Sequence, residues 1–177
     1  MVAQSDYLPF FQVENEIKLT KEMTEPKAAR QENIMKIRAA ALSDHKELTH
    51  LSKVLGYPIE EEVLIEGLKR ILAEEDHLLL VAEIKGKAVG MIEAQLYSTV
   101  YSAGQFFNVL GLVVDDQVQK QGVGGKLLSA IEEARQRGMQ GIRLNSNVKR
   151  HAAHRFYENH GYQSSHEQKR FIKELHY

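Results

Sequence analysis

Cysteine is absent from this chain of 177 residues. Its absence excludes disulfide bonds, zinc sites built from thiolates and a cysteine nucleophile. A chain that forms no disulfide is typical of a reducing compartment, so we expect the protein to be cytoplasmic.

An excess of charge of one sign and a long apolar run are missing as well. Lys and Arg number 23 against 24 Asp and Glu, which gives a formal net charge of −1. Proteins that bind nucleic acids usually carry a basic excess that neutralises phosphates. No apolar run approaches the length that spans a bilayer, and the first residues lack the pattern of a signal peptide. We therefore expect neither a nucleic-acid partner nor a membrane partner.

The composition is otherwise that of one globular domain, with 43% hydrophobic residues. Residues 1–34 have a different character, because they become charged after a short apolar stretch and show no long apolar period. We expect residues 1–34 to be an N-terminal extension and residues 35–177 to form the folded domain.

Helix and strand patterns follow one another regularly from residue 34. The order βααβββαβαββ predicts an α/β fold with a mixed sheet of about seven strands flanked by about four helices. Gly111 predicts a bulge or a close backbone approach within its strand. The expected elements are a strand at 34–39, helices ending near Leu55 and Ala73, a hairpin at 77–97 that turns at Lys85–Gly86–Lys87, a strand at 105–114, a helix ending at Gly138, a strand at 141–148, a helix at 149–160 and two short strands within 162–175.

The stretch QVQKQGVGGKLL, residues 117–128, places glycines between a strand and a helix. A Walker-type phosphate loop is excluded because no Ser or Thr follows Gly125–Lys126, and a dinucleotide fingerprint is excluded because its third glycine is missing. The remaining pattern Q-x-x-G-x-G is formed by Gln119, Gly122 and Gly124. It lets backbone N–H groups at a helix N-terminus face an anion such as a pyrophosphate. Capping glycines in a surface turn are the simpler interpretation of this stretch alone.

A second motif, RHAAHRFYENHGY at residues 150–162, lies further along the chain. Together the two motifs resemble those of the Gcn5-related N-acetyltransferase (GNAT) superfamily, and the resemblance covers about residues 35–175. The first motif matches the acyl-CoA signature Q/R-x-x-G-x-G/A of that superfamily. The second motif matches the family helix N-x-x-A-x-x-F-Y-x-x-x-G-F/Y at Ala153, Phe156, Tyr157, Gly161 and Tyr162. At its first position, Arg150 stands where the family usually has asparagine.

The resemblance implies a GNAT-like fold whose sheet is mostly antiparallel and has a splayed central strand pair. It implies direct transfer of an acyl group, usually acetyl from acetyl-CoA, to an amine in a ternary complex. The acceptor would be a small-molecule or peptide amine, and a homodimer is one possible assembly because family members are often dimers. The alternative is a non-catalytic acyl-CoA-binding or sensing module of the same fold.

The resemblance also implies roles for individual residues. Tyr157 is expected to be the general acid that protonates the departing thiolate. The backbone of Leu112, Val113 and Val114 is expected to bind the pantetheine arm. The other expected donor-binding residues are Gln119, Lys120, Gln121, Gly122, Val123, Gly124, Gly125 and Lys126 at the pyrophosphate, with Arg150 and Ala153 on the later helix.

A general base is marked less clearly. Glu93 and Asp115 are the candidates, although exposed carboxylates are more often solvated surface charges and water can also take the proton. His151 and His154 have the spacing of two metal ligands on one helix face. Surface histidines are far more common than such a site, so no metal site is expected.

Overall fold

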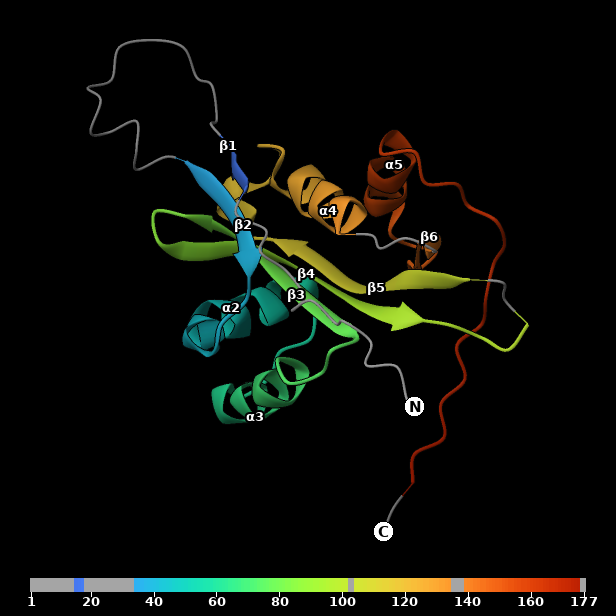
Figure 1. Ribbon diagram of the computed structural model, residues 1–177, viewed down its shortest axis with the longest axis horizontal. Coiled ribbons are helices and arrows are strands. Elements are labelled where there is room, and N and C mark those ends of the chain that lie inside the picture. Colours follow the sequence, from blue (N-terminus) through green and yellow to red (C-terminus); the bar gives the residue numbers. More distant parts are fainter. Residues whose placement is uncertain (1–14, 18–33, 102–103, 135–138, 176–177) are drawn as a thin grey trace, which may run out of the picture. The chain divides into compact units, whose positions relative to one another are not determined.

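The computed structural model describes residues 15–17, 34–101, 104–134 and 139–175, and the chain divides into two units, residues 1–145 and 146–177. The second unit contains α5 (His151–Asn159). The elements of the first unit, labelled in Figure 1, are β1 (Asn15–Ile17), β2 (Met35–Ala39), α2 (His45–Leu55), α3 (Glu61–Ile71), β3 (His77–Ile84), β4 (Lys87–Tyr97), β5 (Gln105–Val114), α4 (Val123–Glu133) and β6 (Met139–Leu144).

A six-stranded sheet runs through the first unit, with its strands in chain order from β1 to β6. All neighbouring strands are antiparallel except β5 and β6, which are parallel. Lys85 and Gly86 join β3 to β4 with φ angles of 53° and 74°. A two-residue hairpin turn that follows the twist of its strands requires such positive angles. The expected hairpin and the mixed, mostly antiparallel sheet are confirmed.

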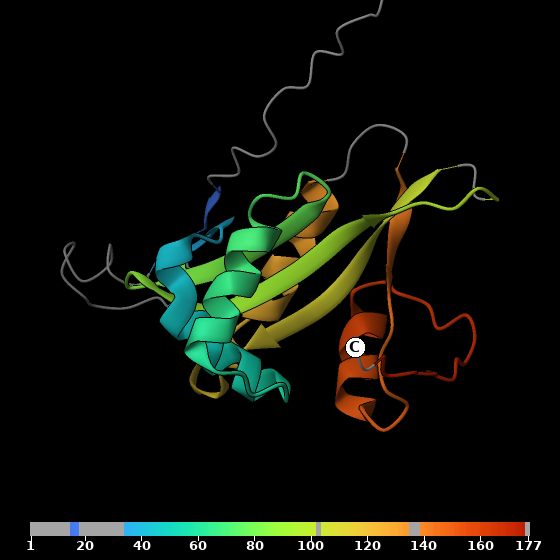
Figure 2. The same cartoon turned by 90° about the horizontal axis from the view of Figure 1, so that it is seen from below.

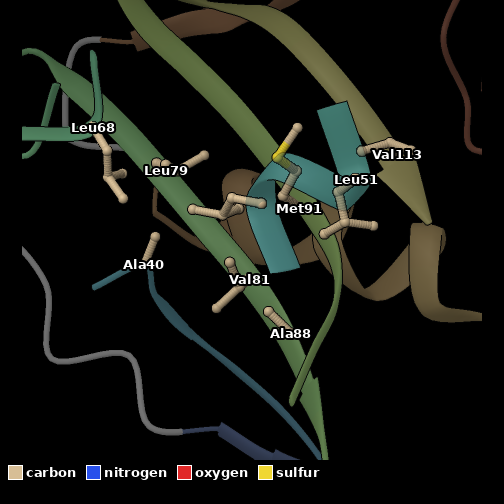
Figure 3. Close-up of a cluster of buried hydrophobic side chains, with 9 residues drawn as sticks. Ala40, Leu51, Leu68, Leu79, Val81, Ala88, Met91 and Val113 are labelled. Atoms are coloured by element: carbon tan, nitrogen blue, oxygen red, sulfur yellow. The ribbon is translucent and has the colours of Figure 1, made fainter. Parts of the chain in front are cut away.

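Helices cover both faces of this sheet, with α2 and α3 on one face and α4 on the other (Figures 1 and 2). Leu48 and Leu51 lie one turn apart on α2 and pack in a buried cluster with Leu68 of α3. We call this side of the sheet the α2/α3 face. Its strand residues in the cluster are Leu79, Val81, Ala88, Met91 and Val113 (Figure 3).

Gly90 of β4 lets α4 approach the opposite face closely. A Cβ atom at this position would lie 3.1 Å from the Val113 carbonyl oxygen, 3.2 Å from Leu127 Cδ1 and 3.3 Å from Val123 Cγ1. These distances are tighter than ordinary contacts, so a side chain here would require its neighbours to shift in a close-packed interior. The first turns of α4 therefore pack directly on the strand backbone, near the end of β5.

Strand β5 contains a bulge and then separates from β6. Pairing with β4 skips Leu110, which is the extra residue beside Gly111. The β5–β6 ladder ends at Val109 and Leu144, while β5 continues to Val114. The expected bulge is confirmed, and β5 continues beyond the end of β6 at the position where the splayed strand pair is expected.

In the second unit, the described residues that follow α5 form no helix or strand. Gly161 ends α5 with a φ angle of 83°. The Tyr162 N–H donates to the Tyr157 carbonyl at 3.1 Å, and the Gly161 N–H donates to the Glu158 carbonyl at 3.0 Å. This pair of bonds is a Schellman motif, which needs the left-handed conformation that glycine adopts without strain.

The prediction of two short strands within 162–175 is wrong, because the structure has no strand there. The polar run QSSHEQKR has no alternation that would bury one face of a strand. The apolar residues that follow, Phe171, Ile172 and Leu175, are 88%, 68% and 64% exposed.

The strand expected at 141–148 is β6, which begins earlier and ends at Leu144. After it, the Asn147 side chain accepts the Lys149 N–H at 2.9 Å, a local bond that turns the chain. With β1 added and the last two strands missing, the described sheet has six strands instead of about seven.

Part of the expected N-terminal extension pairs with the sheet, because β1 runs antiparallel to β2. Residues 1–14 and 18–33, and the helix end expected at Gly138, lie outside the described residues. Within the described ranges, no helix has the length and apolar character needed to cross a bilayer.

Arg38 of β2 joins the sheet to the start of α2. Its guanidinium donates to both carboxylate oxygens of Asp44, at 2.7 and 2.8 Å, and its Nε donates to Glu83 of β3 at 2.6 Å. Asp44 also accepts the Ala41 N–H at 2.8 Å. Burial acts to raise the pKa of Asp44, but Arg38 and the Ala41 N–H outweigh it and hold that pKa below its usual value.

Replacing Asp44 by alanine is expected to lower the free energy of unfolding at neutral pH by about 2–4 kcal/mol, because Arg38 loses its bidentate partner. The difference from wild type should be complete above the ordinary carboxyl pKa of about 3.9. It should shrink as the pH falls further, since the wild-type carboxylate then becomes protonated. Urea unfolding at neutral and strongly acidic pH measures both effects.

The control is Glu66→Ala, which removes an exposed ion pair with Lys69. It should change the stability by less than about 0.5 kcal/mol. Equal losses from the two variants would contradict the structural role assigned to Asp44.

Candidate active site

The glycine-rich stretch follows β5 as a turn that Gln119 ties to the end of the strand. The side-chain amide nitrogen of Gln119 donates to the Val114 carbonyl at 3.1 Å and to Oδ1 of Asp116 at 2.6 Å. The glutamine of the Q-x-x-G-x-G pattern thus shapes the loop that leads into α4.

Backbone N–H groups at the N-terminus of α4 have no side-chain cap. Gly122 is the N-cap with a φ angle of 81°, and Lys120 before it has a φ angle of 63°. The first turn, which begins at Val123, contains no acidic residue. The first N–H groups of a helix lack partners within it and form the positive end of its dipole. This end of α4 is therefore suited to an anion.

A free edge of β5 leads to this helix end. The Asp115 N–H donates to the Val89 carbonyl of β4 at 2.8 Å, and backbone groups alternate in direction along an antiparallel strand. The N–H and C=O groups of Leu112 and Val114 therefore point away from β4, toward the side on which β6 has already ended. The backbone of Val113 points to β4.

Glu93 lies on the α2/α3 face, across from the bulge of β5. It pairs with Gly111 in the ladder, and its Oε1 lies 2.8 Å from Nε2 of His77 on β3. The other ring nitrogen of His77 lies 3.3 Å from Oε2 of Glu74, and the histidine side chain is only 7% exposed. The ring holds Glu93 through one nitrogen and is itself held by Glu74 through the other.

Asp115, the second candidate base, is engaged by other groups. Its Oδ1 accepts the Gln117 N–H at 2.8 Å, and its Oδ2 lies 2.6 Å from Nε2 of His50 on α2. The Gln117 N–H, and after it His50, hold the pKa of Asp115 below its usual value. A carboxylate with a lowered pKa is a weaker proton acceptor.

Tyr157 lies on α5 in the second unit, and its ring packs against two other aromatic rings. The ring centroids of Tyr162 and Phe156 lie 5.9 Å and 5.3 Å from its own. Burial raises the pKa of the Tyr157 phenol above its usual value, and Arg150 offsets this only in part. Arg150 is the N-cap residue of α5, and Ala153 is half-buried in its first turn. The raised pKa keeps the phenol protonated.

The histidines of α5 are engaged within the second unit. His151 and His154 meet edge to face with ring centroids 6.0 Å apart, and Nε2 of His154 lies 3.0 Å from the Asn147 carbonyl oxygen. Among the residues that the structure describes, no three acidic or histidine side chains are arranged to share a metal ion.

Comparison with known proteins assigns the family. Residues 75–164 match the family described as Acetyltransferase (GNAT) domain. This chain belongs to the GNAT acetyltransferases. The aminoalkylphosphonate N-acetyltransferase of Salmonella typhimurium is 32% identical to it over 151 residues, which cover 82% of this chain and 97% of the relative.

Two solved structures show the same fold. A protein of Bacillus halodurans C-125 described as a transcriptional regulator is 28% identical, with a TM-score of 0.71 over 78% of this chain and 99% of its own. A GNAT family acetyltransferase of Staphylococcus aureus is 27% identical, with a TM-score of 0.65 over 80% of this chain and 98% of its own.

This GNAT protein is an acyl-CoA-dependent N-acetyltransferase, and acetyl-CoA is its acyl donor. The activity of the Salmonella relative favours an enzyme over the non-catalytic module considered as the alternative. The uncapped end of α4 and the free edge of β5 fit a donor that carries a pyrophosphate and a strand-like amide arm.

The expected donor-side residues 112–114 lie at the end of β5 and residues 119–126 at the turn into α4 and its first residues, with Glu93 beside the bulge. Two contributors to this arrangement were not predicted. Gly90 admits α4, and the only signal for it was a glycine inside an alternating strand. His77 holds Glu93, a contact that depends on the register between β3 and β4.

Replacing Gly124 by aspartate is expected to weaken acetyl-CoA binding roughly 100-fold or more, because a carboxylate at the helix N-terminus repels the pyrophosphate. Gly124→Asn is the matched control, since it adds a side chain of the same size without the charge. Titration calorimetry measures the affinity, and circular dichroism checks that both variants are folded. Unchanged affinity in the folded aspartate variant would overturn the placement of the pyrophosphate at this helix end. Equal losses of affinity in both variants would show that the added side chain acts through its size and not through its charge.

Proposed function

We propose that this enzyme acetylates the amine of a small molecule by direct attack of the amine on acetyl-CoA, with Glu93 as general base and Tyr157 as general acid. The observation that carries the proposal is the free edge of β5. Its backbone groups run from the bulge opposite Glu93 to the uncapped end of α4.

The donor is proposed to lie along this edge. Residues 119–126 hold the pyrophosphate at the N-terminus of α4, where N–H groups and the helix dipole face it. The free groups of Leu112 and the N–H of Val114 bind the pantetheine arm as they would bind an added strand. Val113 is not included, because its backbone faces β4. Arg150 and Ala153 remain proposed donor contacts on α5.

Acetyl transfer needs one proton acceptor and one proton donor. The amine lone pair forms the new C–N bond at the thioester carbon, and the C–S bond breaks with its electron pair going to sulfur. Glu93 takes the proton that the amine loses, and Tyr157 gives its phenolic proton to the thiolate. Asp115 is not proposed as the base, because its carboxylate is already stabilised by two partners.

A small amine is the proposed acceptor, in preference to a peptide. The Salmonella relative is named for aminoalkylphosphonates, and the similarity covers 97% of its length. Half-buried polar side chains, Gln95 and Asn108, lie in register on β4 and β5 beyond Glu93. They offer amide groups to a small polar substrate.

Tyr157→Phe is expected to keep acetyl-CoA affinity and to lower turnover roughly 10- to 1,000-fold, since only the phenolic proton is lost. The raised pKa of Tyr157 predicts that the wild-type enzyme retains its acid above the ordinary tyrosine pKa of about 10. Release of free thiol, followed under conditions in which chemistry limits the rate, measures turnover. Equal turnover in the two proteins would leave Tyr157 as a packing residue only.

Glu93→Gln is expected to lower kcat on the order of 100-fold with little change in acetyl-CoA affinity, because the amide keeps the shape of the side chain and cannot accept the proton. Glu66→Gln, at an exposed position of α3, should leave kcat unchanged. A larger loss from Asp115→Asn than from Glu93→Gln would transfer the role of base to Asp115.

A further inference from the structure

Arg143 of β6 lies on the ring of a tyrosine two strands away. Its guanidinium carbon is 4.5 Å from the centroid of the Tyr97 ring on β4, which is within the range of a cation–π contact. Gly141, two residues before it, pairs with Phe106, and a Cβ atom there would lie 3.6 Å from the Phe106 ring. A Cβ atom at position 141 would thus make an ordinary van der Waals contact with the Phe106 ring.

Arg143 differs from an arginine that only stabilises the fold. Arg38 is held by two carboxylates, at 2.6 to 2.8 Å. Among the described residues, by contrast, no carboxylate pairs with Arg143 and no acceptor receives its N–H groups. Contact with an aromatic face leaves the edge of the guanidinium, with its fork of N–H donors, open to a ligand. The half-buried guanidinium of Arg143 can therefore still bind an anion.

Arg143 and the proposed base lie on the same face of the sheet. Arg143 pairs with Asn108, and Asn108 pairs with Gln95, which follows Glu93 at the next position on that side of β4. Side chains in register on neighbouring strands point to the same face, and the contact between Arg143 and Tyr97 agrees with this. Toward β6, this part of the sheet extends beyond α2 and α3 (Figure 2).

We propose that Arg143, supported by Tyr97, binds an acid group of the acceptor, so that the substrate is a short amine carrying a phosphonate or a carboxylate. The inference rests on the proposed function, since it takes Glu93 as the site of the amine. Strands about 4.8 Å apart with a rise of about 3.3 Å per residue place the Cα atoms of Glu93 and Arg143 roughly 12 Å apart. Arg143 is directed to the Tyr97 ring and Glu93 to His77. A separation of this order leaves space for a molecule with a few carbon atoms between its amine and its acid.

Each end of such a molecule meets the opposite charge. The ammonium group approaches the Glu93 carboxylate, and the acid oxygens accept two N–H bonds from the guanidinium fork. An amine without the acid group can occupy the Glu93 end only. Arg143 is therefore a specificity-determining residue, which acts on the acceptor and not on the donor.

Acetylation of three matched acceptors by the full chain tests this inference. They are aminoethylphosphonate, β-alanine and ethylamine, and free-thiol release gives kcat and KM for each. Wild type is expected to prefer the two acids. Arg143→Gln should raise KM for the preferred acid roughly 10- to 100-fold, with kcat, acetyl-CoA affinity and all constants for ethylamine unchanged. The ratio of the two acids in wild type identifies phosphonate or carboxylate as the natural group.

Further variants distinguish the effect of the two hydrogen bonds from the guanidinium from the effect of its positive charge. Arg143→Lys keeps the charge and should show a smaller rise in KM, because a lysine offers no bidentate fork. Tyr97→Leu should also raise KM for the acids, whereas Tyr97→Phe should not. Lys46→Gln removes one positive charge from an exposed position of α2 and should leave all constants unchanged. Should Arg143→Gln fail to fold, Arg143→Lys and Tyr97→Leu decide the question.

Three results would overturn the inference while leaving the proposed function intact. The first is a wild-type enzyme that shows no preference for the acids. The second is an Arg143 variant whose KM for the acids is unchanged. The third is an Arg143 variant whose KM for ethylamine rises as much as its KM for the acids. A wild-type protein that releases thiol with none of a broad panel of amines would instead refute the proposed function itself.

Discussion

Strand β5 is paired on both sides from Phe106 to Val109 and on one side only from Gly111 to Val114, because β6 ends at Leu144. Backbone N–H and C=O groups inside a sheet need partners, and leaving them without one costs free energy. The bulge beside Gly111 lies where β6 ends and β5 becomes a local edge. This edge ends at the uncapped helix α4 and begins across from the proposed base. A substrate arm that forms hydrogen bonds as a strand does can complete the sheet.

Close packing fixes the position of α4 relative to this free edge of β5. Gly90 and Gly111 lie on adjacent strands and admit helices on opposite faces, since Gly90 contacts α4 and a Cβ at Gly111 would lie 3.2 Å from the Leu55 side chain of α2. A larger residue at either position would push its helix outward. Displacing α4 would move Gly122 away from the end of β5, and the anion site would move with it. The donor side of the enzyme therefore depends on one missing side chain in the middle of a strand.

Local features were predictable from the sequence, because each depends on a few neighbouring residues. The turn at Lys85–Gly86 and the bulge beside Gly111 need conformations or space that glycine provides. Contacts between strands were not predictable in the same way. The bond between Glu93 and His77 depends on a register, and a shift of one residue would turn one of the two side chains to the other face. The strands expected within 162–175 are wrong because a polar segment has no apolar pattern that would hold it in a sheet.

Arginine and carboxylate side chains in this protein differ in whether other residues already bind their charged groups. Arg38 and Asp115 are already bonded to groups that satisfy them, so they gain little from a ligand. Arg143 rests on an aromatic ring with its N–H edge uncommitted, and the described residues contact only one oxygen of Glu93. A charge that has lost water gains most from a new partner of opposite sign. Two such charges of opposite sign on one face of the sheet therefore favour a substrate that carries both an amine and an acid group.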